Sequence, residues 1–504
     1  MLSLKGSSKA LVCKLKDKIT TKLGRKRSVK LTNSLESPSP NLLVLPDELL
    51  IQIESYLDDQ NDVRNACLVS RSLARTSQEK LYRNIDLVHN GKFASGPATY
   101  SLRLLLRTLI ERSDLASRVK SLNMYIGNYQ RSWEDMHGTS DAFNVREARY
   151  PMEEILSDFH IQMLSMVVLQ LKVPSERPWM LDVRSGCDGA LAGVLLAMLP
   201  RLSKLKIETA RSMPPFLKML FASDPDGRFP LFRIAGFAGL KDCLISHHMA
   251  NFSWFGIGKE VPLLGLPYLT TLHLSSLHQP VALPHTRFTN CVGISNVTDL
   301  RIEGVNIQNI AQFLGCFKPL RSFAYCGHNV PTLNNIIVDF SDVVPLLYKS
   351  YSSLEYLEIT LLTDRPDLIY RLVGSLHRFQ RLKEFVIPQR AFLGNISHCT
   401  KTLIDFLPSS LETLTLVQAN NDIWTDLRSF ASRKSKAAQE HDVLFAVPNL
   451  RNIRLDWRGG ACDKDEWGSL SAFMAYDELF DILRDLRVDI EMLGNEANFK
   501  AYKV

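Results

Sequence analysis

Apolar residues recur along most of this chain in a six-residue pattern, apolar-x-x-apolar-x-apolar, often after a proline or a short polar turn. In the second half of the chain, successive copies begin 28, 23, 34, 28, 29 and 39 residues apart. The alternation over the last four positions is typical of a β-strand buried on one face. Stretches with helical character, such as residues 366–379 and 400–406, lie between the copies. The nine copies are Val119/Leu122/Met124, Leu202/Leu205/Ile207, Leu269/Leu272/Leu274, Val297/Leu300/Ile302, Leu320/Phe323/Tyr325, Leu354/Leu357/Ile359, Leu382/Phe385/Ile387, Leu411/Leu414/Leu416 and Leu450/Ile453/Leu455.

The recurrence of a strand and a helix every ~20–30 residues resembles the leucine-rich repeat. In that family each unit needs its neighbours to complete a core. The resemblance is to irregular repeats, because the Asn or Cys position of regular repeats is not clearly present. Two gaps of 83 and 67 residues also imply long insertions or missed units. The resemblance implies an irregular α/β solenoid over residues 87–504. A generic α/β domain whose strands share an apolar pattern is the alternative.

In such a solenoid, the residues between the apolar strand positions point to the concave face, where these proteins usually bind partners. Their charges are of both signs, so the pattern indicates neither a polyanionic nor a polycationic ligand. They are Lys204/Lys206/Glu208, Asp299/Arg301/Glu303, Tyr356/Glu358/Thr360, Thr413/Thr415/Val417 and Asn452/Arg454/Asp456.

Residues 45–82 have a different pattern, which predicts three short helices. Pro46 followed by two acids is typical of a helix start, because proline lacks only an N–H that has no helical partner there. After a polar break at 58–61, helical spacing continues through residues 63–73 and then 77–82. Three helices of this size are too small to complete a core alone. The first helix has one apolar face, formed by Leu49, Ile53, Tyr56 and Leu57.

These features resemble the F-box, which has a Leu-Pro opening, an acid, paired aliphatics, an Ile-x-x-x-Leu helix and a Leu-Val-Ser core in its second helix. Leu81 and Tyr82 are similar to the Leu-Tyr pair that precedes the next domain in fungal versions. One departure is Leu73, where many members have Trp. An amphipathic hairpin of the main domain is the alternative. Within residues 41–86, the matching positions are Leu45, Pro46, Asp47, Glu48, Leu49, Leu50, Ile53, Leu57, Leu68, Val69 and Ser70.

The resemblance implies a substrate-recognition subunit of an SCF-type cullin–RING ubiquitin ligase. In that role the F-box binds a Skp-type adaptor, which connects it to the cullin scaffold, and the C-terminal region captures an unknown protein substrate. The subunit itself is non-catalytic. A protein-interaction scaffold outside a ligase is the alternative, and an enzyme with its site in the insertions is a third hypothesis. The adaptor-binding residues implied by the resemblance are Leu45, Pro46, Leu49, Ile53, Leu57, Leu68 and Val69.

Positive charge is concentrated at the N-terminus. Residues 1–31 contain ten Lys or Arg and one Asp, a net charge of +9, whereas the whole chain has +7. The remainder is therefore slightly acidic, which gives no reason to expect nucleic-acid binding by the folded body. We interpret residues 1–40 as a basic disordered tail. Residues 24–30, GRKRSVK, alternatively indicate nuclear localisation or polyanion binding, and a mitochondrial presequence is a third interpretation.

Composition and motifs argue against several other classes. No stretch reaches the ~20 apolar residues that a membrane helix needs, so no membrane partner is expected. The nine scattered cysteines form no CxxC pair, which indicates reduced thiols in the cytoplasm or nucleus. The chain contains no GxxxxGK[ST] phosphate loop, HExxH zinc helix or GxSxG nucleophile elbow. We therefore predict no catalytic residue, cofactor or metal site.

Overall fold

The computed structural model describes most of the chain after its N-terminal segment. The tail predicted for residues 1–40 lies outside the described residues, as do residues 400–405 of a predicted helix. The described segments are 46–57, 59–88, 97–126, 155–171, 176–184, 186–209, 234–247, 262–276, 292–304, 310–327, 337–339, 343–361, 369–371, 374–393, 406–419, 423–440, 447–456 and 477–493.

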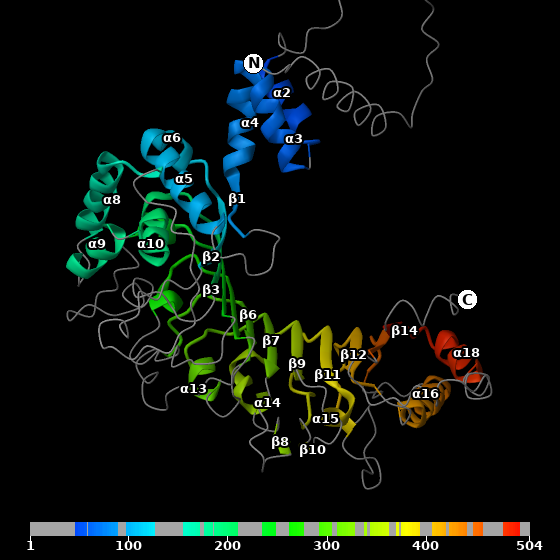
Figure 1. Cartoon of the computed structure of the whole chain (residues 1–504). Helices are drawn as coiled ribbons and strands as arrows, with labels where there is room; N and C mark the ends of the chain where they lie inside the picture. Colours follow the sequence, from blue (N-terminus) through cyan, green and yellow to red (C-terminus); the bar gives the residue numbers. More distant parts are fainter. Residues whose placement is uncertain are drawn as a thin grey trace, which may run out of the picture.

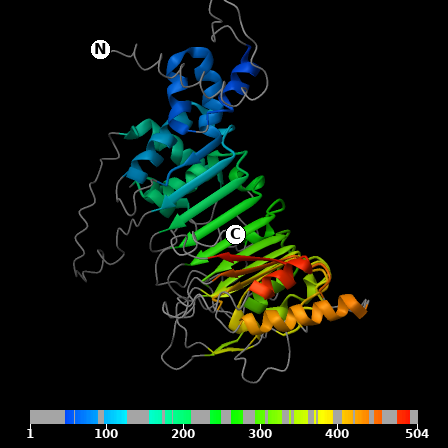
Figure 2. The same ribbon diagram turned by 90° about the vertical axis from the view of Figure 1, so that its right-hand side faces the viewer.

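One long parallel sheet dominates the molecule. Within the described residues it has twelve strands, and their spatial order is their order along the chain. Figures 1 and 2 show them following one another from blue to red. The strands are β1 (Asn84–Asp86), β2 (Ser121–Ile126), β3 (Lys204–Thr209), β4 (Asp242–His247), β5 (Thr271–Ser276), β6 (Asp299–Glu303), β7 (Ser322–Gly327), β9 (Tyr356–Leu361), β11 (Glu384–Pro388), β12 (Thr413–Val417), β13 (Asn452–Asp456) and β14 (Asp489–Leu493).

The sheet follows directly from the apolar pattern. Every residue of the nine copies is buried, and each copy supplies one strand. The pairing keeps the copies in register, so that Leu300 lies beside Leu272 on one strand and Phe323 on the other. Aligned apolar residues on every strand form one continuous buried face, which contributes ~25 cal/mol per Å² of apolar surface removed from water. The core is a single cluster that extends from Ile85 to Val488.

Three strands were missed by the pattern. In β4 the corresponding residues are Leu240, Cys243 and Ile245; all are buried, but cysteine takes the central apolar position. In β14 the first position is Arg487, which lies in the left-handed region with φ of 58°. β1 has only three residues, too few to show alternation. β4 fills the gap of 67 residues, whereas helices occupy much of the gap of 83.

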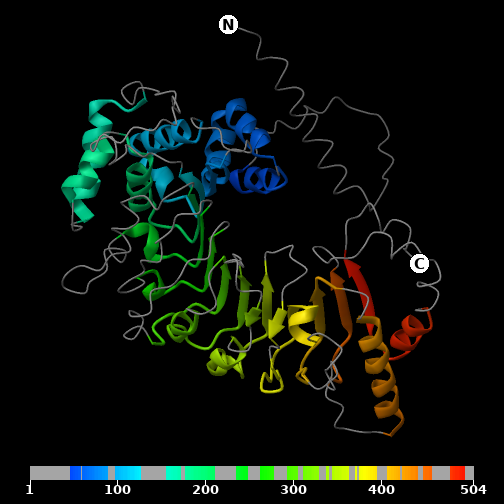
Figure 3. The same cartoon turned by 60° about the horizontal axis from the view of Figure 1, so that its bottom comes forward.

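Helices cover the apolar face of the sheet. Figure 3 shows the strands along an arc with these helices on its outer side, so the other sheet face lies on the inner side. The helices after β1 are α5 (Pro97–Glu111), α6 (Ser113–Ala116), α8 (Asp158–Leu171), α9 (Glu176–Arg184), α10 (Asp188–Met198), α12 (Ala235–Ala238), α13 (Ile310–Gly315), α14 (Val343–Leu346), α15 (Gln389–Leu393), α16 (Ile423–Glu440) and α18 (Asp477–Asp485), with 3₁₀ turns η3 (Pro262–Gly265) and η5 (Tyr348–Ser350).

The helix predicted at residues 366–379 is wrong over its described part. Ile369–Arg371 forms strand β10, which pairs with β8 (Ile337–Asp339) in a separate two-stranded sheet. Gly374 has φ of 86°, a backbone conformation that a right-handed helix does not contain. Backbone pairing and this glycine override the helical spacing of the apolar residues.

A ladder of backbone hydrogen bonds joins the strands at the edge where they begin. A carbonyl oxygen at the start of one strand accepts hydrogen bonds from the N–H groups of two consecutive residues at the start of the next strand. The Thr270 oxygen, for example, accepts from Thr298 N (2.9 Å) and Asp299 N (3.0 Å). Side chains extend the ladder: the Ser353 hydroxyl donates to the Leu320 oxygen at 2.6 Å. These repeated contacts satisfy backbone groups that would otherwise lack partners at the strand ends.

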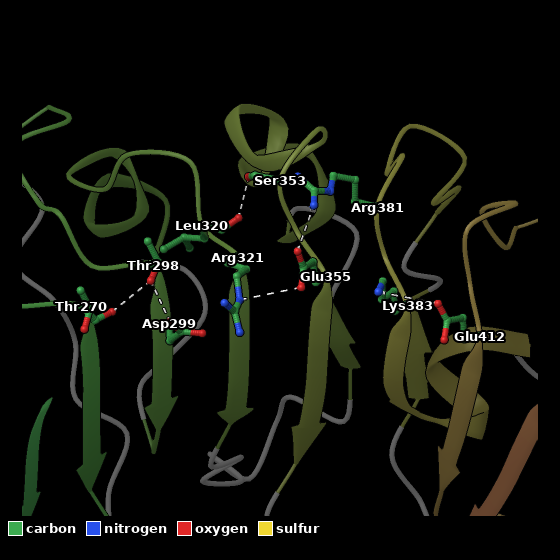
Figure 4. A network of polar contacts seen from close by, with 10 residues as sticks. All are labelled: Thr270, Thr298, Asp299, Leu320, Arg321, Ser353, Glu355, Arg381, Lys383 and Glu412. Carbon is green, nitrogen blue, oxygen red and sulfur yellow. Dashed lines mark hydrogen bonds and ion pairs between the residues drawn. The ribbon is translucent and has the colours of Figure 1, made fainter.

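Charged side chains alternate along the same edge, as Figure 4 shows. Glu355 lies between Arg321 (3.8 Å) and Arg381 (3.4 Å), and Lys383 pairs with Glu412 at 3.8 Å. Exposed pairs of this kind contribute little individually, at most ~1 kcal/mol. The backbone ladder, rather than these pairs, holds this edge together.

Candidate partner-binding surfaces

Three helices precede the sheet, as the sequence predicts. They are α2 (Asp47–Glu54), α3 (Gln60–Val69) and α4 (Arg71–Arg83). The Asp59 side chain caps α3 by accepting from Asn61 N at 2.8 Å. The Ser70 hydroxyl caps α4 by accepting from Leu73 N at 3.2 Å. The second helix, predicted over residues 63–73, therefore ends earlier, because Ser70 is extended and starts α4.

The three-helix unit has only a small apolar core of its own. Leu57, Val63 and Ala66 form it, with Leu81 packed against them. In α2, the buried residues are Leu50 and Glu54, at a spacing of four. Leu57 is thus a core residue that supports the unit, although the sequence placed it among the adaptor-binding residues.

Large aliphatic side chains are exposed on α2 and α3. Leu49 is 45% exposed and Leu68 is 79% exposed, so both side chains are accessible on the surface of the helical unit. Ile53 and Val69 are half-buried and Pro46 is exposed, whereas Leu45 lies outside the described residues.

Ile51, which is 50% exposed, was missed by sequence reasoning. The sequence indicates the exposure of Ile51 only indirectly, through the helical spacing of its neighbours. Leu50 and Glu54 face inward at a spacing of four, so a residue one position after Leu50 is turned about 100° away from them.

The helical unit continues into the sheet without a linker. α4 ends at Arg83 and β1 begins at Asn84. The backbone carbonyl oxygen of Arg83 accepts a hydrogen bond from Lys120 N at 2.9 Å, so the last residue of α4 makes the first hydrogen bond of the edge ladder. Tyr82 packs against the main core, and burial raises the pKa of its hydroxyl. These contacts tie the three helices to the body.

The inner face of the sheet carries polar side chains at its centre. The outward residues named from the sequence alternate with the apolar core residues on their strands, although Thr413 and Asp456 are themselves buried. On β6, Arg301 Nε contacts Glu303 Oε1 at 2.7 Å, and His273 Nε2 on β5 lies 3.3 Å from the same oxygen. Arg301 Nη1 also reaches Glu358 Oε2 on β9 at 3.2 Å, where the Tyr356 hydroxyl donates at 2.7 Å.

These contacts have clear electrostatic consequences. The contacts of Glu303 with His273, first, and then with Arg301 lower the pKa of its carboxyl group to about 2. Burial raises the pKa of the Tyr356 hydroxyl, and the neighbouring Glu358 carboxylate raises it further. The cluster therefore holds the Glu303 carboxylate ionised and in a fixed position on the inner face.

The inner face is negatively charged over its second half. At the outward positions of the described strands β6 to β14, seven acidic residues, of which Asp456 is buried, accompany two basic ones, so acids outnumber bases on this part of the face. The acids are Asp299, Glu303, Glu358, Glu384, Asp456, Asp489 and Glu491, and the bases are Arg301 and Arg454.

No group of three or more His, Cys, Asp or Glu side chains suited to a metal ion occurs among the residues that the structure describes. In that same part of the chain, no helix has the length and hydrophobicity needed to cross a bilayer.

The comparison with protein families matches the helical unit. Residues 42–88 match the family described as F-box-like, a match that covers α2 to α4 and extends through β1. It supports an F-box protein. F-box proteins are generally non-catalytic substrate receptors, and an F-box implies binding to a Skp-type adaptor in cullin complexes. The comparison with curated proteins gives no match.

The chain thus combines an F-box-like domain with a long sheet of parallel strands. The predicted division at residues 40 and 86 and the predicted set of adaptor-binding residues remain predictions.

Proposed function

We propose that this protein is the substrate-recognition subunit of an SCF-type ubiquitin ligase, acting in the cytoplasm or nucleus. Its F-box would bind the Skp-type adaptor, and its body would capture a protein substrate without performing chemistry itself. The observation that carries the proposal is the F-box-like match over residues 42–88, whose last helix, α4, passes directly into β1 of the sheet. A receptor needs such a rigid connection, because it works by holding the substrate at high effective concentration near the ligase.

We further propose that residues 87–504 form an irregular leucine-rich-repeat-like solenoid. Chain-ordered parallel strands support this, because each unit then buries its apolar face only against its neighbours. The substrate-binding surface would be the inner face of the sheet. Its excess of carboxylates favours a substrate segment rich in Lys and Arg.

Adaptor co-purification tests the first half of the proposal. We expect Leu45→Ala combined with Pro46→Ala to abolish it, because each large aliphatic at such a surface contributes ~1.5–3 kcal/mol. Leu181→Ala is a matched control, since Leu181 is an exposed aliphatic (66%) on α9, outside the F-box. Adaptor binding equal to wild type in the double variant would refute the F-box assignment.

Immunopurification with and without proteasome inhibition tests the second half. A ligase receptor should recover adaptor and cullin, and its substrate should accumulate under inhibition. Recovery of adaptor without cullin would instead favour a scaffold that acts outside the ligase. Glu384→Lys, at an exposed inner-face position, should reduce substrate recovery while adaptor recovery is unchanged.

A further inference from the structure

Polar contacts join the last residue of the first F-box helix to α4. α2 packs against α4, yet the small apolar cluster of Leu57, Val63 and Ala66 contains no residue of α2 itself. In addition to the fully buried Leu50, α2 buries its last residue, Glu54, which has 3% of its surface exposed. A carboxyl group in this position needs hydrogen-bond partners, because burying it without them is costly.

Two hydroxyl groups of α4 provide those partners. Glu54 Oε1 accepts from Thr76 Oγ1 at 2.6 Å and from Ser77 Oγ at 2.5 Å. Both hydroxyl residues are buried, so these contacts are shielded from water. The carboxylate also affects its neighbour Cys67. Burial raises the pKa of the Cys67 thiol, and the negative charge of Glu54 raises it further.

Lys80 completes the connection from the next turn of α4. Its Nζ donates to the backbone carbonyl oxygen of Glu54 at 2.7 Å and to the backbone carbonyl oxygen of Leu57 at 2.6 Å. A cation at the C-terminal end of a helix is favoured by the carbonyl groups that have no helical partner there. Three hydrogen bonds to Glu54, and two more from Lys80 to the Ser55 and Leu57 carbonyl oxygens, thus join the end of α2 and the residues after it to α4.

Directional contacts determine orientation in a way that apolar contacts do not. Replacing a buried polar network by apolar groups of similar shape is often neutral for stability, so the network contributes chiefly to a unique geometry. α2 carries Leu49 and Ile51 on its exposed sides, and their positions depend on how α2 sits on α4.

We infer that Glu54 is a positioning residue for adaptor binding: through Thr76, Ser77 and the carbonyl groups held by Lys80, it sets the orientation in which α2 presents Leu49 and Ile51. This inference rests on the proposed adaptor-binding function. It assigns to a buried acid a role that the sequence pattern gave to apolar residues alone.

The decisive experiment compares Glu54→Leu with the triple variant Glu54→Leu/Thr76→Val/Ser77→Ala in the full chain. The single variant removes the acceptor shared by two buried hydroxyls and leaves Thr76 only its longer contacts with backbone carbonyl oxygens of α4 (3.2 Å to Leu73), so its thermal midpoint should fall. The triple variant removes both sides of the network, and its midpoint should return close to wild type. Its adaptor affinity should nevertheless fall about tenfold, as expected if the competent orientation is only ~10% populated. Glu54→Gln retains an acceptor oxygen and should bind within about twofold of wild type.

Hydrogen exchange of residues 47–54 provides a readout that does not depend on the adaptor. We expect these amides to exchange faster in the triple variant, while those of α4 remain protected. A triple variant with wild-type adaptor affinity and wild-type exchange in α2 would overturn the inference. If the wild-type chain binds no adaptor, the proposed function fails, and unchanged exchange of α2 would then refute the positioning role separately.

Discussion

Arg301 on β6 reaches Glu358 on β9 by passing over the intervening strand β7. Arg301 Nη1 lies 3.2 Å from Glu358 Oε2, although neither strand pairs with the other. The residue in register between them is Ala324, which is buried beneath the pair. Two strand spacings of ~4.8 Å separate the pair, a distance that a long arginine spans only if the central side chain is small.

Ala324→Leu should therefore break the bridge. The larger side chain has no space beneath Arg301 and Glu358, and we expect a loss of ~1–3 kcal/mol in the free energy of unfolding, measured by urea denaturation. Val386→Leu, in the same row but two strands beyond Ala324, is the matched control and should change stability by less than about 0.5 kcal/mol. Equal stability of the two variants would show that the contact does not depend on a small residue at position 324.

The stability of the inner face should depend on pH through Glu303. Its folded-state pKa is lowered to about 2 from 4.5, chiefly by the contact with His273. A lowered carboxyl pKa stabilises the fold above the unfolded-state value, and this contribution disappears as pH falls from about 4.5 toward 2. Glu303→Gln should thus be less stable than wild type at pH 7, and the difference should shrink as the pH falls through this range in urea titrations. A difference that stays constant from pH 7 to pH 3 would contradict the assignment.

Leu57 and Leu68 should respond oppositely to truncation. Leu57→Ala removes a core side chain and should lower the free energy of unfolding of the F-box by ~2–5 kcal/mol, a large loss for so small a core. Leu68→Ala removes a side chain that is 79% exposed, so the thermal midpoint should stay within about 1 °C of wild type while adaptor affinity falls. Calorimetry and adaptor titration of both variants check this. Loss of stability without loss of affinity in Leu68→Ala would remove Leu68 from the adaptor surface.

The strands could be predicted from the sequence because large aliphatics at alternating positions have few other solutions. Leu414 and Leu416, for example, can both be buried only if their strand has one inward face. The same reasoning missed β4 and β14 because Cys243 and Arg487 occupy positions where an aliphatic was expected. Cysteine is as readily buried as an aliphatic, but its presence in a pattern is a weaker signal.

The partner surface was harder to predict, because side-chain identity does not reveal which way a helix faces. Leu49 and Leu50 are identical residues, yet one is 45% exposed and the other is fully buried. The difference is set by tertiary contacts of α2 with α4. Glu54 was missed for the same reason: an acid is normally read as exposed, and its buried role depends on Thr76 and Ser77, more than twenty residues away.

The last helix ends in a motif that a single substitution should improve. After α18, Val488 N donates to the Leu483 oxygen and Arg487 N to the Arg484 oxygen, both at 2.8 Å. This is the Schellman arrangement, with Arg487 in the left-handed conformation at φ of 58°. The left-handed conformation destabilises a non-glycine residue by ~1–2 kcal/mol in the folded state. Glycine avoids this strain, but it also raises the conformational entropy of the unfolded chain, which offsets part of the gain.

Arg487→Gly should therefore raise the free energy of unfolding by about 0.5–1 kcal/mol, measured by urea denaturation of the full chain. Gly293→Ala is the matched control of opposite sign. Gly293 has φ of 68° with open space around it, so alanine should destabilise through backbone strain alone, by ~1 kcal/mol. A destabilised Arg487→Gly variant would show that the arginine side chain contributes more than its backbone conformation costs.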